Sequence, residues 1–402
     1  MRTPFLRASL LALAVGATVG LTACAGGTGS ATPGSAAPAS NAPAETGTRV
    51  ALSYPGGIVV LDGASLEALG DVSSEQFTRL NSAGDGRHVM VTTSEGFQVL
   101  DAGTPDAEPE LTDLVFPAAK PGHVVTHGGK TVLYADGTSD STVFDSDALL
   151  ASTDSLPAVE TIPGVEAHHG VSIVLEDGTF LTTVGNADGR NGVIAKDASG
   201  ATIAQSSDCP GVHGEGTAKD EVVVFGCENG ALVYDAGTFT KLTAPDQPYG
   251  RMGNAYVSED SALIVGDYKD DPDAEGYLLH RVALIDTAAK TQRVIDLPEG
   301  VEYTFRDIAR GPGGLAYILA TDGSIHVLDP ATGDLTASYP VIGAWEGPAE
   351  WQDAHPAIKV SGDIAYVTEP AKNAVHAVDL PTGNVVKSVT LDQAPNEIAL
   401  TR

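Results

Sequence analysis

One short pattern recurs eight times between residues 59 and 391: an apolar strand ends in an aspartate, a turn follows, and a second strand begins. The stretches QVLDAGT (98–104) and HVLDPATGDL (326–335) are two examples. Aspartate followed by glycine or threonine favours an Asx-type turn between two strands. A spacing of 38 to 52 residues between short strands indicates a β-propeller with one blade per repeat. The repeated aspartates are Asp62, Asp101, Asp145, Asp197, Asp235, Asp286, Asp329 and Asp379.

Each repeat holds four expected strands, which the seventh shows most fully at 305–310, 314–320, 325–328 and 335–341. The first repeat lacks an innermost strand, whereas residues 393–402 form a spare strand after the last repeat. Pairing this spare strand with the first repeat closes the ring and removes the free sheet edges. No segment shows sustained helical periodicity. The sequence therefore predicts an all-β fold, an eight-bladed propeller closed by the C-terminal strand, with seven blades as the alternative.

The N-terminus has the pattern of an exported protein. A basic start, a short apolar run and small residues make residues 1–23 a secretory signal. The sequence LTAC (21–24) resembles a bacterial lipoprotein box, which makes Cys24 a lipidated first residue; the alternative is a plain signal peptide with a free cysteine. Acyl chains would anchor the protein without a spanning helix. Residues 24–47, rich in Gly, Ser, Ala and Pro, are expected to be a flexible tether before a propeller domain at 48–402. We therefore expect an extracytoplasmic, cell-surface lipoprotein.

Charge and cysteine content narrow the partners and the compartment. A net charge of −31 argues against nucleic acid, which requires basic surfaces. Besides Cys24 the chain has two cysteines, Cys209 and Cys227. In an exported protein an isolated pair indicates a disulfide, which contributes about 3 kcal/mol by the chain-entropy relation. A two-cysteine metal site is the alternative.

Half of the ten histidines occupy one position of the repeat, eight to eleven residues before a second strand. The innermost strands of a propeller start on one face around the central channel, so these histidines are expected to meet. Three or four such nitrogens suit a zinc, copper, nickel or iron ion. Polar strand-end roles are the alternative for each one. His127 lies inside an innermost strand and joins the candidate ligands, of which we expect three or four to bind: His123, His127, His168, His169, His213 and His355.

Three carboxylates stand two residues from a candidate histidine: Glu166, Glu215 and Asp353. Each is a candidate ligand or a partner that orients an imidazole through its second N–H. A surface role is the alternative for each.

Several motifs resemble the AztD-type zinc metallochaperones, exported propellers that accompany a zinc ABC importer. The motifs are EAHHGVS (166–172), CPGVHGE (209–215), VVFGCENGALVY (223–234) and AHPAI (354–358), and the resemblance covers most of 48–402. It implies that the metal is Zn and that the partner is the importer's solute-binding protein. Carried over by position, the implied ligands are His168, His169, His213 and His355, with His123 or His127. The chain has no histidine-rich loop of the kind such proteins can carry, so we expect one zinc site.

Two other functions fit the same pattern. A metal-free propeller would serve as a recognition surface. A metal-dependent propeller enzyme would use Glu166 or Glu215 as acid or base beside an open coordination position. No Ser-His-Asp or glycine-rich phosphate-binding motif fixes a reaction. The sequence therefore favours a monomeric zinc-transfer protein that is not an enzyme.

Overall fold

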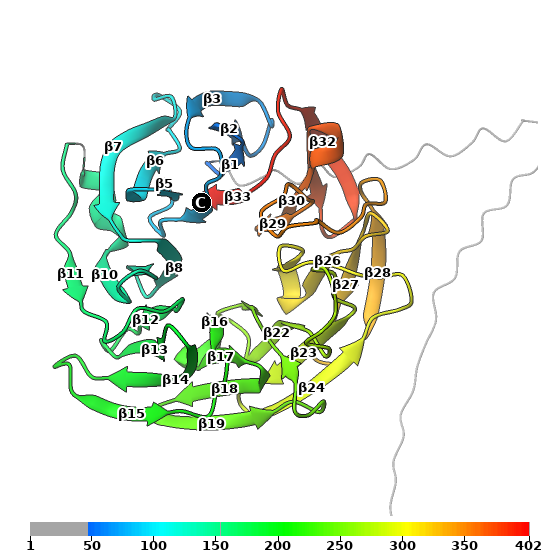
Figure 1. Ribbon diagram of the computed structural model, residues 1–402. Coiled ribbons are helices and arrows are strands. Elements are labelled where there is room, and N and C mark those ends of the chain that lie inside the picture. The colour runs from blue at the N-terminus through cyan, green and yellow to red at the C-terminus, as the bar shows by residue number, and fades with distance from the viewer. Residues whose placement is uncertain (1–46, 153, 402) are drawn as a thin grey trace, which may run out of the picture. The chain divides into compact units, whose positions relative to one another are not determined.

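Eight small antiparallel sheets form a ring in the computed structural model, which describes residues 47–152 and 154–401 (Figure 1). Each sheet is one blade, and the blades follow one another along the chain. The predicted all-β propeller with eight blades is therefore confirmed. The expected signal peptide, Cys24 and nearly all of the expected tether lie outside the described residues.

The first four blades are listed from the innermost strand outward. Blade one contains β33 (Ile398–Thr401), β1 (Arg49–Tyr54), β2 (Gly57–Asp62) and β3 (Ala68–Ser73). Blade two contains β4 (Leu80–Ser82), β5 (His88–Thr93), β6 (Gly96–Asp101) and β7 (Glu110–Pro117). Blade three contains β8 (Pro121–His127), β9 (Lys130–Ala135), β10 (Asp140–Asp145) and β11 (Glu160–Ile162). Blade four contains β12 (Ser172–Val174), β13 (Phe180–Asn186), β14 (Gly189–Lys196) and β15 (Thr202–Ser206).

The other four blades have the same order. Blade five contains β16 (His213–Thr217), β17 (Val223–Cys227), β18 (Asn229–Asp235) and β19 (Thr238–Thr243), with β20 (Gly250–Arg251) beside β18. Blade six contains β21 (Ala255–Tyr256), β22 (Leu263–Tyr268), β23 (Arg281–Asp286) and β24 (Thr291–Asp296). Blade seven contains β25 (Ile308–Arg310), β26 (Ala316–Leu319), β27 (Ser324–Leu328) and β28 (Leu335–Pro340). Blade eight contains β29 (Ile358–Ser361), β30 (Ile364–Glu369), β31 (Ala374–Asp379) and β32 (Asn384–Thr390).

Helical structure in the described residues is limited to four short 3₁₀ turns: η1 (Ser146–Ala151), η2 (Lys219–Glu221), η3 (Pro312–Gly314) and η4 (Pro370–Lys372). Within those residues there is no helix with the length and apolar character needed to cross a membrane. In blade seven, η3 occupies the start expected for the second strand. The innermost strand is also shorter than expected, because Asp307 accepts a hydrogen bond from the Thr304 N–H and forms a turn there.

The C-terminal strand closes the ring as predicted. In Figure 1, β33 (red) lies beside β1 (blue), and the two pair antiparallel from Arg49↔Thr401 to Leu52↔Ile398. Blades one and eight also share a hydrogen bond, which the buried Tyr366 hydroxyl donates to the Gly63 carbonyl over 3.0 Å. Because the first and last residues of the propeller share one sheet, closure requires the whole domain.

The eight repeated aspartates make three kinds of contact. Five of them form the predicted Asx-type turns, accepting from the backbone N–H two residues further on: Asp62, Asp101, Asp197, Asp286 and Asp329. Asp145 and Asp235 instead pair with Lys130 and Lys290 at 2.5 and 2.7 Å. Asp379 accepts a hydrogen bond from the Thr382 hydroxyl. The repeated position therefore marks the end of a third strand in every blade, although the contact made there varies.

The blades are held together by apolar packing between sheets. Between blades four and five, Leu181, Val193, Val223 and Phe225 are fully buried in one cluster. The outermost strand of blade seven, β28, alternates between exposed and half-buried residues, because it packs on one side only. The predicted disulfide between Cys209 and Cys227 is present and fully buried, joining the loop before β16 to the end of β17.

Candidate metal centre

Three imidazoles from consecutive blades converge at the inner edge of the ring. His123 lies in β8, His169 precedes β12, and His213 begins β16. These strands are neighbours around the channel in Figure 1. One nitrogen from each ring lies within 4.8 Å of the others, and the ring centroids are 5.0 to 5.3 Å apart. We call these three residues the histidine triad.

Hydrogen bonds fix which nitrogen of two rings faces the triad. His213 Nδ1 lies 2.6 Å from the Gly253 carbonyl, which can only accept, so Nδ1 carries the proton. His169 Nδ1 lies 2.7 Å from the Asp136 carboxylate, which likewise accepts a hydrogen bond from the protonated Nδ1. Each Nε2 is therefore left with a lone pair, yet the two Nε2 atoms are only 3.0 Å apart. Such a contact is stable only with a proton or another cation between the nitrogens.

Burial keeps two members of the triad in the neutral form that binds metals. The pKa of His213 is lowered to about 3, and desolvation is the largest cause. The hydrogen bond to Gly253 opposes this shift, whereas the charges of His169, Arg251 and Arg190 add to it. Desolvation likewise holds the pKa of His123 well below its usual value, with smaller contributions from the other two rings. Neutral imidazole is the ligand form, so these side chains are ready to bind a cation at neutral pH.

The spacing of the triad suits a tetrahedral ion after a small adjustment. Zn–N bonds of about 2.0–2.1 Å place the nitrogens of a tetrahedral site about 3.3 Å apart. The His169–His213 pair, at 3.0 Å, is already near this value, and His123 would approach by a small side-chain movement. Three protein ligands leave one coordination position open.

The position of the Gly253 carbonyl, which orients His213, is fixed by its neighbours. The Asp267 carboxylate accepts hydrogen bonds from the N–H groups of Gly253 and Asn254 at 2.5 and 2.9 Å. It thereby holds the carbonyl that orients His213. Gly214 has a φ of +56°, and a Cβ there would lie 2.3 Å from the same Gly253 carbonyl oxygen. A side chain at position 214 would therefore displace the hydrogen-bond partner of His213.

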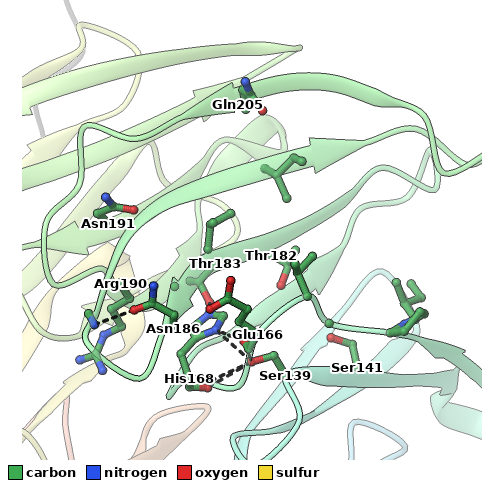
Figure 2. Close-up of a pocket in the computed structure, with 18 of the residues that line it drawn as sticks. Ser139, Ser141, Glu166, His168, Thr182, Thr183, Asn186, Arg190, Asn191 and Gln205 are labelled. Carbon is green, nitrogen blue, oxygen red and sulfur yellow. Dashed lines mark hydrogen bonds between the residues drawn. The ribbon is translucent and has the colours of Figure 1, made fainter.

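His168 faces away from the triad, although it is adjacent to His169. Its Nε2 lies 3.0 Å from the Tyr134 hydroxyl and 3.1 Å from the Thr183 hydroxyl. Its Nδ1 lies 2.9 Å from the Ser139 hydroxyl and the Glu166 carbonyl. Figure 2 shows this ring in the wall of a separate pocket of about 630 Å³ between blades three and four. Both nitrogens of His168 thus serve the contact between these blades.

The other two candidate histidines also lie outside the triad. His127 ends β8, at the opposite end of the strand from its entrance, and its Nε2 lies 2.7 Å from the Glu221 carboxylate. His355 precedes β29 in blade eight, across the channel from the triad: two blades separate blade eight from blade three, and two separate it from blade five. It is 2 % exposed, and its Nδ1 donates to the Asp353 carbonyl over 2.7 Å.

The three carboxylates expected near the histidines have other positions. The Glu166 side chain is exposed, and its carbonyl oxygen is what contacts His168. Asp353 accepts from the Glu350 N–H at 3.0 Å. Glu215 faces the central cavity, where burial raises its pKa to about 7. The carboxylate on a triad ring is instead Asp136, in the turn after β9.

Sequence reasoning missed Asp136, Gly253 and Asp267. Asp136 stands in an ordinary Asp-Gly turn, and Asp267 at the end of a buried strand, so neither carried a local signal. Gly214, which was also not predicted, did have a local signal in the sequence, because it directly follows His213.

Comparison with known proteins places this geometry in context. The chain is 24 % identical over 300 residues to the zinc chaperone AztD of Citrobacter koseri, covering 72 % of this chain and 68 % of that protein. Two solved structures of Citrobacter koseri AztD, one of them apo, match with a TM-score of 0.72 at 21 % identity, covering 88 % of this chain and 97 % of theirs. The chain is AztD-like in sequence and fold. The resemblance predicted from the sequence motifs is therefore confirmed.

The propeller fold also occurs in a more distant neighbour. The dihydro-heme d1 dehydrogenase NirN, solved in complex with DHE, matches with a TM-score of 0.60 at 12 % identity, covering 88 % of this chain and 75 % of NirN. At 12 % identity, the likeness to NirN shows the fold alone. No family model matches the chain.

Proposed function

We propose that this protein is an extracytoplasmic zinc metallochaperone, not an enzyme, that delivers Zn²⁺ to the solute-binding protein of a zinc ABC transporter. The observation that carries the proposal is the pair of Nε2 atoms on His169 and His213, oriented toward each other at 3.0 Å with His123 beside them. Among the metals that imidazole binds, similarity to a zinc chaperone favours zinc.

The triad has the properties that a transfer site needs. Three imidazole nitrogens bind zinc, while the open fourth position can accept a ligand from a partner before any bond to the triad breaks. The His169 side chain is 37 % exposed, so a partner can reach the site from solvent. Zinc could then pass between proteins by stepwise ligand exchange.

Zinc binding is tested on two neighbouring histidines. Purified protein, stripped with EDTA and reloaded, is analysed for zinc by mass spectrometry. We expect about one zinc per chain in the wild type, and loss of bound zinc in His169→Ala. His168→Ala is the matched control, because it removes the adjacent ring without touching the triad, and should retain zinc. Equal zinc content in all three proteins would overturn the proposal.

Delivery is tested with a purified zinc-free solute-binding protein from a zinc ABC importer. Zinc-loaded protein is mixed with it in the presence of a chelator that traps free zinc. Direct transfer predicts that zinc reaches the solute-binding protein faster than it dissociates into chelator alone. If the chelator captures all the zinc at the dissociation rate, the protein binds zinc but does not deliver it to that partner.

Export and anchoring through Cys24 belong to the same proposal. The lipoprotein motif at 21–24 supports removal of residues 1–23 and acylation of Cys24. Labelling of cells with a fatty-acid analogue should mark the wild type and not Cys24→Ser, which should leave the membrane fraction. Light scattering on the purified protein should give the mass of a monomer.

A further inference from the structure

The channel of the propeller contains a cavity that carries positive charge. Its volume is about 250 Å³, and the innermost segments of most blades line it. Among its lining residues are Arg79, Arg306 and Lys359, facing Glu397. The chain has 22 lysines and arginines against 53 acidic residues, so three cations around one cavity stand out from an otherwise acidic protein.

One of these cations makes several close contacts within the wall of the cavity. Arg306 is buried and pairs with Glu397 at 2.7 Å. It also donates to the Asn396 side-chain oxygen at 2.7 Å and to the Trp351 carbonyl at 3.2 Å. Arg306 and Glu397 therefore neutralise each other and form part of the wall.

Arg79 and Lys359 are the uncommitted cations. The nearest approach of Arg79 to Glu397 is a long 3.8 Å, and its buried Nε has no hydrogen-bond partner among the described residues. Its guanidinium lies 5.7 Å from the centre of the Trp351 ring, which holds it in place through a cation–π contact. Lys359 is the exposed residue between the buried Ile358 and Val360 in β29, and its side chain lines the cavity. Within the described part of the chain it makes no hydrogen bond or ion pair.

We propose that this cavity binds a small organic carboxylate, such as a di- or tricarboxylate, between Arg79 and Lys359. An arginine fork matches a planar carboxylate, and an ammonium group adds a second charged contact. Asn81 lines the same cavity and offers a neutral donor. The cavity has room for roughly eight waters at about 30 Å³ each, which is the size of such an anion.

Electrostatics agree with this geometry. Burial lowers the pKa of Lys359, and repulsion by Arg79 and Arg306 lowers it further against the attraction of Glu397. An entering anion would relieve this repulsion. Glu215 and His123 line the cavity as well, so an ionised Glu215 would oppose the anion. This proposal goes beyond zinc transfer and does not depend on it.

The test is calorimetric titration of the metal-free protein with malonate, succinate and citrate at constant ionic strength. We expect saturable binding of at least one of them with one site per chain. Lys359→Met and Arg79→Gln should each weaken it about tenfold or more, the effect of one charge-assisted contact. Lys387→Met, on the exposed outer strand β32, is the matched control and should bind like the wild type.

Two further measurements keep the test independent of folding and of zinc. Lys359→Arg retains the charge and should bind within about threefold of wild type. If substitution at position 359 weakened binding only by disturbing the fold, Lys359→Arg would also bind weakly. His169→Ala should bind the carboxylate unchanged. Absence of saturable binding, equal weakening by Lys387→Met, or tighter binding of inorganic sulfate than of any carboxylate would overturn the proposal.

Discussion

The Asp136 carboxylate lies 2.7 Å from Nδ1 of His169 and so turns the Nε2 of that ring toward His213. A carboxylate behind a metal-binding imidazole fixes the ring and raises its basicity. We predict that Asp136→Asn keeps one zinc site but weakens zinc affinity about 10- to 100-fold. Competition with a zinc indicator measures the change. Asp145→Asn, in the same blade but paired with Lys130 on the surface, is the control and should leave affinity unchanged.

Zinc binding should release a proton. The 3.0 Å contact between the Nε2 atoms of His169 and His213 requires a shared proton in the absence of a metal, and zinc must replace it. Calorimetry of zinc binding at pH 7 in buffers of different ionisation enthalpy should give about one proton released per zinc. His168→Ala should release the same number. A value near zero in the wild type would mean that the two nitrogens share no proton.

Gly214 should be essential to the geometry of the site although it provides no ligand. A methyl group there would lie 2.3 Å from the Gly253 carbonyl oxygen, and the φ of +56° disfavours any side chain. We expect Gly214→Ala to lower the free energy of unfolding by about 1–3 kcal/mol and to weaken zinc binding. Gly189→Ala, where a Cβ would meet nothing within 4 Å, should change neither. Chemical denaturation and zinc competition on both variants decide this.

The repeat predicted the fold because it encodes a contact that every blade makes. Each aspartate marks the end of a third strand, and a ring of such units can close only with the C-terminal strand in blade one. The number of blades and the closing strand therefore followed from the sequence. The exact strand ends did not, because local turns such as the one at Asp307 depend on side-chain hydrogen bonds.

The candidate site was only partly predictable. Repeat position brought His123, His169 and His213 to one face, but the same position holds His355, which blade order places across the channel. The sequence also left open which of His168 and His169 faces the axis. That choice depends on partners from blade three, Ser139 and Tyr134, which hold the His168 ring.

The disulfide should stabilise both the fold and the loop that carries His213. Cys209 and Cys227 are 18 residues apart with His213 between them. A closed loop of this size contributes about 3 kcal/mol. We expect Cys209→Ala/Cys227→Ala to lower the free energy of unfolding by about that amount and to weaken zinc binding. Guanidinium unfolding measures the first effect, and zinc competition measures the second. Wild type that is denatured, reduced and refolded with its cysteines reduced should match the double variant in both.

Acidification should destabilise the metal-free protein partly through His355. Burial, followed by the charge of Arg306, lowers the pKa of His355 to about 4, whereas an unfolded histidine has a pKa of about 6.5. Between these values the unfolded chain binds the proton and the folded chain does not. The stabilising effect is therefore complete above about pH 6.5 and is lost as the pH falls toward 4, with a slope of at most about 1.4 kcal/mol per pH unit.

His355→Gln removes this titration, so the variant should lose less unfolding free energy than wild type between pH 7 and pH 4.5. Urea denaturation at both pH values gives the two differences. His280→Gln is the control, because the His280 side chain is 58 % exposed and should leave the wild-type difference intact. The carboxylates titrate equally in all three proteins and cancel in the comparison. If His355→Gln retained the full wild-type dependence, the acid sensitivity would come from other groups, which include the carboxylates and the triad members His123 and His213, whose pKa values are also lowered by desolvation.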